Sequence, residues 1–230
     1  MKSARDRLIL ALDVPTRAQA LSLTDELLPF IGMVKVGLQL FTAEGPDLVC
    51  ALRDNGVRVF LDLKLYDIPN TVARAVEAAA RLDVQMLTLH LSGGREMIAA
   101  ATNAAPAGLL LLGVTVLTSA NDETLRELGL KEGVAAQVAR LAKLGEQAGL
   151  RGFVASPLEL AALRQILAQD AQLVIPGIRP SGSDAGDQKR TMTPAKAVAA
   201  GADYLVVGRP IRAAEDQKAA ARKIIEELES

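Results

Sequence analysis

The sequence is short of the residues that most often cross-link proteins or bind metal ions. Its 230 residues include one cysteine, Cys50, one histidine, His90, and no tryptophan. A lone cysteine excludes an internal disulfide, and one histidine without cysteine neighbours argues against a zinc site. We therefore expect no metal ion and a reducing, cytoplasmic location. We interpret Cys50 as core packing in a helix and His90 as a hydrogen-bonded strand-end residue outside the catalytic set.

The sequence also lacks an excess of charge of either sign and any long apolar run. Its 26 Lys and Arg residues balance 27 Asp and Glu residues, which leaves a formal charge of −1. This balance excludes the broad basic field typical of nucleic-acid binding and the basic tract typical of membrane-surface binding. No apolar stretch reaches membrane-spanning length, and the first residues do not resemble a signal peptide. Binding of a phosphate group must therefore depend on a few local cations.

Short apolar runs alternate with longer helical patterns along the whole sequence. No linker or shift in composition divides the chain, so we predict one domain over residues 1–230. The predicted strands are residues 8–13, 33–36, 57–64, 85–90, 109–117, 152–155, 173–175 and 204–207. Eight strand–helix pairs in a chain of this length predict a closed (β/α)8 TIM barrel. An open doubly wound sheet is the alternative, but Asp13-Val14-Pro15-Thr16 after the first strand lacks its glycine fingerprint.

The third predicted strand carries an acid and a base in an otherwise apolar run. Successive strand side chains point to opposite faces, so Asp62 and Lys64 share one face. The apolar residues Leu61, Leu63 and Leu65 share the other face. Burying a charge is costly unless it is paired, and an Asp-x-Lys pair on its own is readily explained as a structural ion pair.

Further polar residues follow neighbouring strands. In a barrel the carboxyl ends of the strands meet at one mouth, so Asp13 and Lys35 are expected beside Asp62 and Lys64. Asp67 follows in the next loop. Four converging charges favour a catalytic site over a structural network. Thr118, after strand five, either binds the polar edge of a ligand or caps the following helix.

The loops after the last two strands point to an anionic ligand. Residues 179–191 form a polar, glycine-containing loop that is too long for a simple turn, and we predict that it closes over a ligand. The last strand runs into Gly208 and Arg209, where glycine permits close approach and arginine offers a forked cation. Either Arg179 or Arg209 alone is readily explained as a solvated surface charge. Both together in these two loops favour a phosphate site.

Five motifs in order match one known family. They are Leu10-Ala11-Leu12-Asp13, Val34-Lys35-Val36-Gly37, Phe60-Leu61-Asp62-Leu63-Lys64-Leu65-Tyr66-Asp67-Ile68-Pro69-Asn70-Thr71, Pro176-Gly177-Ile178-Arg179-Pro180 and Val207-Gly208-Arg209-Pro210-Ile211. With these motifs the chain resembles the orotidine 5′-monophosphate decarboxylase family along nearly its whole length. The resemblance implies decarboxylation of orotidine 5′-monophosphate to UMP, the final step of UMP biosynthesis. It also implies that neither a metal nor an organic cofactor is used.

The resemblance implies a role for each matching residue. Lys64 is expected to donate the proton, within a network that also contains Lys35, Asp62 and Asp67. The residues expected to bind substrate are Asp13, Lys35 and Thr71 at the ribose, Thr118 at the pyrimidine, and Arg179, Gln188, Gly208 and Arg209 at the phosphate. Gln188 is expected on the closing loop. The family forms a homodimer, so Asp67 and Thr71 are expected to reach into the partner's site.

Two other functions stay open at this point. One is a magnesium-dependent phosphosugar decarboxylase or aldolase of the same barrel superfamily, which shares the Asp-x-Lys pattern. The run Asp67-Ile68-Pro69-Asn70-Thr71 after Lys64 argues against it. The other is a non-catalytic barrel that binds a nucleotide, and the complete set of charges argues against that.

Overall fold

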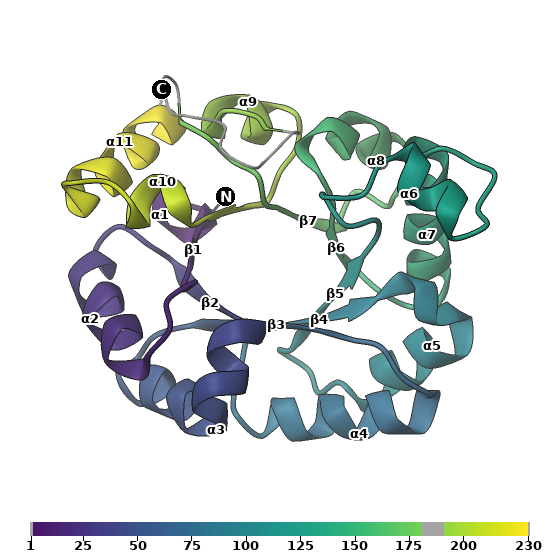
Figure 1. The fold of residues 1–230 in the computed structure, drawn as a ribbon, viewed down its shortest axis with the longest axis horizontal. Coiled ribbons are helices and arrows are strands. Elements are labelled where there is room, and N and C mark those ends of the chain that lie inside the picture. Colours follow the sequence, from purple (N-terminus) through teal and green to yellow (C-terminus); the bar gives the residue numbers. More distant parts are fainter. Residues whose placement is uncertain (1, 181–190, 230) are drawn as a thin grey trace.

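The chain forms a closed barrel of eight parallel strands. The computed structural model describes residues 2–180 and 191–229. The strands are β1 (Leu8–Ala11), β2 (Met33–Gly37), β3 (Val59–Leu65), β4 (Met86–His90), β5 (Leu110–Val114), β6 (Gly152–Val154), β7 (Gln172–Ile175) and β8 (Tyr204–Val207). Each strand pairs with the next in sequence, and β8 pairs with β1 to close the ring (Figure 1). The predicted (β/α)8 barrel is confirmed.

Helices surround the barrel on its outside (Figure 1). They are α1 (Ala4–Arg7), α2 (Arg17–Leu27), α3 (Leu38–Asp54), α4 (Pro69–Ala80), α5 (Gly94–Ala104), α6 (Asp122–Glu127), α7 (Val134–Gln147), α8 (Leu160–Ile166), α9 (Pro194–Ala199), α10 (Arg209–Arg212) and α11 (Gln217–Glu229), with 3-10 turns at Leu91–Gly93 and Pro157–Glu159. Local sequence explains where two of these helices begin: the Thr16 side chain caps the amino end of α2, and Pro69 is the first residue of α4.

Two apolar layers hold the barrel together. The outer layer lies between the strands and the helices and includes Leu61, with Leu63 and Leu65 packed against it. The inner layer fills the barrel itself and consists of Ile9, Ala11, Met33, Phe60, Met86, Leu112, Val174, Tyr204 and Val206. Each large side chain that is fully buried contributes about 1.5–3 kcal/mol to folding. The alternation along β3 therefore directs its leucines outward to the helices and Asp62 and Lys64 toward the barrel axis.

Strand five is shorter than its sequence predicts. The apolar run suggested a strand over residues 109–117, but β5 ends at Val114. The neighbouring strand β6 ends at Val154, which pairs with Val114. The residues that follow Val114 therefore have no β6 residues to pair with. The chain then leaves the barrel toward α6, whose first turn is capped by Asn121 in a capping box with Thr124. The alternative that Thr118 caps this helix is therefore wrong.

Helix α3 contains a break that its sequence explains. Gly45 has a left-handed φ of 67° and Pro46 follows it, so the helical hydrogen bonds are interrupted there. Within the described ranges 2–180 and 191–229, no helix is both long enough and apolar enough to cross a membrane.

Candidate active site

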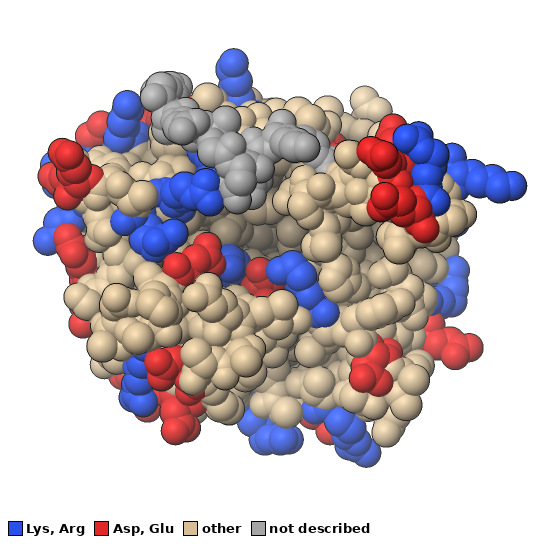
Figure 2. All heavy atoms as spheres, in the orientation of Figure 1, with Lys and Arg blue, Asp and Glu red and all other residues tan. Residues whose placement is uncertain are grey.

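Acidic and basic side chains meet at the mouth formed by the carboxyl ends of the strands. Lys35 comes from β2, Asp62 and Lys64 come from β3, and Asp13 follows β1. The Lys35 Nζ atom lies 3.4 Å from Asp13 Oδ1 and 3.6 Å from Asp62 Oδ2, and the Lys64 Nζ atom lies 2.8 Å from Asp62 Oδ1. Figure 2 shows acidic and basic side chains around the hollow near the centre of this face. We call Asp13, Lys35, Asp62 and Lys64 the mouth network; the structure brings these four predicted residues together.

Asp62 is the centre of the mouth network. Its Oδ1 atom accepts hydrogen bonds from Lys64 Nζ at 2.8 Å and from Thr88 Oγ1 at 2.9 Å, and only 9% of the residue is exposed. Burial, the largest influence, raises the pKa of Asp62, but Lys35, Lys64 and the two hydrogen bonds together hold that pKa below its ordinary value. Asp62 is therefore a carboxylate at neutral pH and keeps two ammonium groups beside it.

Lys64 has an unusual backbone conformation. Its φ of 52° lies in the left-handed region that residues other than glycine rarely adopt, at a cost of about 1–3 kcal/mol. The pairing of β3 with β4 shifts between Leu61 and Leu65, so Lys64 lies in a β-bulge. The Lys64 N–H donates to Thr88 Oγ1 at 2.8 Å. The Lys64 ammonium contacts Asp62 from within this bulge.

Two adjoining cavities open beside the mouth network. The first has a volume of about 150 Å³ and is lined by Lys35, Phe60, Asp62, Lys64, Val114, Val116, Leu117, Thr118, Val154, Ala155, Val174, Pro176 and Val206. The second has about 260 Å³ and is lined by Ala11, Asp13, Lys35, Pro176, Gly177, Arg179, Val206, Gly208, Arg209 and Arg212. Lys35, Pro176 and Val206 line both cavities. A narrow, mainly apolar cavity next to one with three arginines suits a flat ring joined to an anion.

Gly208 is needed where the second cavity meets the barrel. A Cβ atom there would lie 3.2 Å from Ala11 Cβ and 3.3 Å from Asp13 Oδ2, which is closer than ordinary packing. The absence of a side chain lets the chain after β8 approach β1 closely. This places Arg209 and Arg212 at the rim of the cavity.

Two predicted site residues lie away from the mouth network of their own chain. Asp67 and Thr71 are exposed, in the loop after β3 and at the start of α4. The Asp67 Oδ1 atom accepts a hydrogen bond from the Ile68 N–H at 2.7 Å. Among the described residues, Asp67 takes no part in the ion pairs of Lys35 or Lys64. Gln188 and most of the predicted closing loop lie outside the described residues.

Sequence reasoning missed two residues of the site. Thr88 on β4 has no exposed surface and bonds to both Asp62 and Lys64. A threonine between Leu87 and Leu89 on a buried strand was the available signal. Arg212 lines the second cavity one helical turn after Arg209, and that spacing was a usable signal too.

His90 lies near the mouth network without joining it. Burial, the largest influence, lowers the pKa of His90, the Lys64 charge lowers it further, and Asp62 opposes them in part. The ring makes an edge contact with Tyr66, with ring centres 6.1 Å apart. His90 is therefore neutral at neutral pH, which agrees with a packing role. In residues 2–180 and 191–229, no three His, Cys, Asp or Glu side chains are grouped as a metal ion requires.

Known proteins resemble this chain over nearly all of its length. The model of the Orotidine 5'-phosphate decarboxylase / HUMPS family matches residues 6–224. Curated proteins named orotidine 5′-phosphate decarboxylase from Opitutus terrae and Moorella thermoacetica are 54% and 51% identical, over 97% and 98% of this chain and 98% and 93% of their own lengths. A crystal structure of orotidine 5′-phosphate decarboxylase from Lactobacillus acidophilus has a TM-score of 0.86 and 38% identity, covering 97% of this chain and 99% of that one. The similarity extends over the whole barrel.

Proposed function

The chain belongs to the orotidine 5′-phosphate decarboxylase / HUMPS family, and from this membership we propose how its site works. The protein is a carboxy-lyase that converts orotidine 5′-monophosphate to UMP and carbon dioxide, the last step of UMP biosynthesis. The observation that carries the mechanism is the contact of Lys64 with Asp62 beside a cavity of about 150 Å³. The other functions considered from the sequence are not favoured, because the curated relatives, 51% and 54% identical over 93% and 98% of their own lengths, are named orotidine 5′-phosphate decarboxylases.

Lys64 is the proposed proton donor. When the bond between C6 and the carboxylate breaks, carbon dioxide leaves and the electron pair stays on C6, in an orbital that the pyrimidine ring does not readily delocalise. A fixed ammonium beside C6 stabilises this charge as it develops. Lys64 then transfers a proton to C6, which gives UMP and a neutral amine. The amine regains its proton from solvent before the next turnover.

The carboxylates of the network keep Lys64 charged and directed. Asp62 accepts a hydrogen bond from the Lys64 ammonium, which favours its protonated form. Lys35 lies between Asp13 and Asp62 and so holds the two acids at a fixed separation. In this proposal Asp62 also repels the substrate carboxylate, and the repulsion ends when neutral carbon dioxide forms.

The second cavity is the proposed phosphate end. Arg179, Arg209 and Arg212 line it, so up to three guanidinium groups face a dianion there. Gln188 is proposed to join them from the closing loop. Asp13, Lys35 and Thr71 are proposed at the ribose and Thr118 at the pyrimidine, since Thr118 lines the first cavity. The phosphate is distant from the reacting bond, so its binding energy serves to position the ring against Lys64.

A homodimer is proposed to complete the site. Asp67 and Thr71 are exposed in the single chain, and the large apolar residues nearest to Asp67 in sequence are exposed as well: Tyr66 at 62% and Ile68 at 65%. Apolar side chains around an exposed acid suit a protein interface. In the dimer Asp67 and Thr71 reach the partner's mouth network. A cytoplasmic location is part of the same proposal and rests on the single cysteine.

The activity is tested by treating the purified protein with EDTA and following the loss of the orotate chromophore from orotidine 5′-monophosphate. We expect turnover by the wild type and none by Lys64→Ala. Lys218→Ala is the matched control, because it removes an exposed lysine whose partner, Glu26, is 4.0 Å away. Activity that requires added magnesium would favour the phosphosugar enzyme. UMP binding without turnover would favour the non-catalytic barrel.

A further inference from the structure

Thr88 makes two hydrogen bonds of different kinds with the same hydroxyl. The oxygen accepts the Lys64 N–H at 2.8 Å and donates to Asp62 Oδ1 at 2.9 Å. The assignment is fixed by chemistry, because a backbone N–H can only donate and a carboxylate can only accept. Thr88 therefore binds the backbone of the proposed proton donor and the side chain of its acid partner at once.

The position of Thr88 explains why one residue can do this. Leu61 pairs with Leu87, and Leu65 pairs with Leu89. Between these pairs β3 passes through Asp62, Leu63 and Lys64 while β4 passes through Thr88 alone. The hydroxyl thus takes the place of a backbone acceptor for the N–H of the bulge. It supports the left-handed conformation of Lys64 at the point where pairing with β4 is interrupted.

Thr88 also determines how Asp62 is oriented. The Oδ1 atom of Asp62 accepts hydrogen bonds from the Thr88 hydroxyl and the Lys64 ammonium. The Oδ2 atom lies 3.6 Å from Lys35 Nζ. A donor fixed on β4 holds the plane of the carboxylate, since tilting that plane away would leave the hydroxyl without its acceptor. The described lining of the first cavity does not include Thr88, so Thr88 acts on the ammonium without contacting the ring.

We infer that Thr88 is a positioning residue for the decarboxylation, which aligns the Lys64 ammonium through the β-bulge and through Asp62. The inference rests on the proposed role of Lys64. Valine has nearly the same shape as threonine but can neither accept from Lys64 nor donate to Asp62. Thr88→Val therefore leaves the partly buried Lys64 N–H without its acceptor and the Asp62 carboxylate without one donor, while Thr88→Ser keeps both bonds.

The test compares these two variants with wild type and with Thr24→Val. Thr24 is the matched control because it is equally buried, with no exposed surface, and its hydroxyl donates only to the Ala20 carbonyl within α2. The measurements are kcat and KM for orotidine 5′-monophosphate, the dissociation constant for UMP, and the thermal midpoint. A displaced catalytic group costs up to about 100-fold in rate, so we expect kcat to fall about 10- to 100-fold in Thr88→Val. We expect UMP affinity within about threefold of wild type, and kcat near wild type in Thr88→Ser and Thr24→Val.

The pH profile separates positioning from simple loss of stability. Thr88→Val removes a donor to Asp62, so the acid limb of the kcat profile should move to higher pH, whereas Thr24→Val should not move it. An unchanged kcat in Thr88→Val, or an equal loss in Thr88→Ser, overturns the inference. If Thr88→Val does not fold, Thr88→Ala and Thr88→Ser give the same comparison, because they differ by the hydroxyl alone. Absence of turnover in the wild type would instead overturn the function itself.

Discussion

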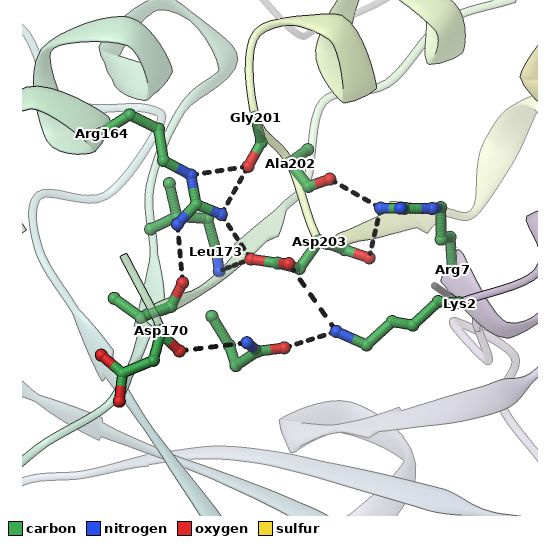
Figure 3. Close-up of polar contacts among 10 residues, drawn as sticks. Lys2, Arg7, Arg164, Asp170, Leu173, Gly201, Ala202 and Asp203 are labelled. Carbon is green, nitrogen blue, oxygen red and sulfur yellow. Dashed lines mark hydrogen bonds and ion pairs between the residues drawn. The ribbon is translucent and has the colours of Figure 1, made fainter. Parts of the chain in front are cut away.

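The barrel carries a cluster of charges at each end, and the two clusters are built differently. At the amino ends of the strands, Asp203 accepts hydrogen bonds from Arg164 and from the Leu173 N–H, and Lys2 lies 3.7 Å from its other oxygen. Arg7 donates to the carbonyls of Ala202 and Asp203 (Figure 3). We call Lys2, Arg7, Arg164 and Asp203 the floor network. It ties the chain before β1, the end of α8 and the starts of β7 and β8 to one another.

The two networks differ in what their cations bind. Arg164 donates to the carbonyls of Gly201 and Ala171 as well as to Asp203, so its fork of donors is largely used within the protein (Figure 3). In the described part of the chain, Lys64 has one hydrogen-bond acceptor, Asp62, for the three donors of its ammonium. Charges that are saturated by backbone groups stabilise a fold, whereas charges with donors left over can act on a ligand.

The backbone shows the same contrast. Among the described residues other than glycine, only Lys64 and Asp83 have positive φ values, 52° and 57°. Asp83 lies in the turn before β4, but Lys64 lies inside a strand. Strain inside a strand persists only when the surroundings hold it, here through Thr88. The mouth network is therefore arranged at some expense in stability, and the floor network is not.

The largest effect should come from removing Lys64. We expect Lys64→Ala to reduce kcat by about 10⁴-fold or more, because both the proton donor and the stabilising charge are lost. The fold should survive, as shown by circular dichroism. Lys64→Gly should be equally inactive yet more stable than Lys64→Ala by about 1 kcal/mol, since glycine accepts a positive φ without strain. Near-normal turnover in either variant would remove Lys64 from the mechanism.

A mixing experiment tests whether the site at the mouth network, unlike the floor network, needs residues from a second chain. Asp67→Ala and Lys64→Ala proteins should each be nearly inactive. In a hybrid dimer the subunit with Lys64 receives Asp67 from its partner, so one of its two sites is complete. Equal mixing should restore about a quarter of the wild-type activity per subunit in a two-fold dimer with random exchange. No recovery after exchange, demonstrated with differently tagged subunits, would show that the site is not shared.

The floor network should affect stability and not rate. Arg164→Ala leaves Asp203 without its main cation and frees two carbonyls, so we expect a loss of about 2–4 kcal/mol in the free energy of unfolding. Denaturant titration measures this loss, and kcat for the folded enzyme should stay within about twofold of wild type. Lys218→Ala is the control, because its partner Glu26 is 4.0 Å away on the surface and exposed pairs contribute about 0–1 kcal/mol. A large fall in kcat for Arg164→Ala would mean that the two ends are coupled.

The smallest expected effect is on the pH dependence of thermal stability, through Asp62. The pKa of Asp62 is lowered from its ordinary value of 3.8, so at pH values above 3.8 the ionised carboxylate contributes its full stabilisation to the folded protein. That contribution is lost as the pH falls through the lowered pKa. The thermal midpoint of Asp62→Asn should therefore depend less on pH than that of wild type as the pH falls below about 4. Asp6 and Glu146 titrate alike in both proteins, so the difference between the two curves isolates Asp62. Parallel curves would contradict a lowered pKa.

The sequence predicted what depends on local pattern. The alternation of β3 placed Asp62 and Lys64 on the barrel side, and the count of strand–helix pairs predicted closure. Pairing across strands was not predictable: the bulge at Lys64 and its bond to Thr88 depend on the register of β3 against β4. The end of β5 at Val114 likewise depends on how far β6 extends. A strand's own residues do not encode where its neighbour stops.

The inner apolar layer has a consequence for the supply of protons. This layer fills the barrel between the mouth network and the floor network with apolar side chains, among them Phe60, Met86 and Leu112. Hydrocarbon at native density conducts neither water nor protons. In the proposed mechanism, the proton that Lys64 gives up in each turnover therefore returns through the same opening by which UMP leaves. Reprotonation of the Lys64 amine and release of UMP therefore share one opening, at the mouth of the barrel.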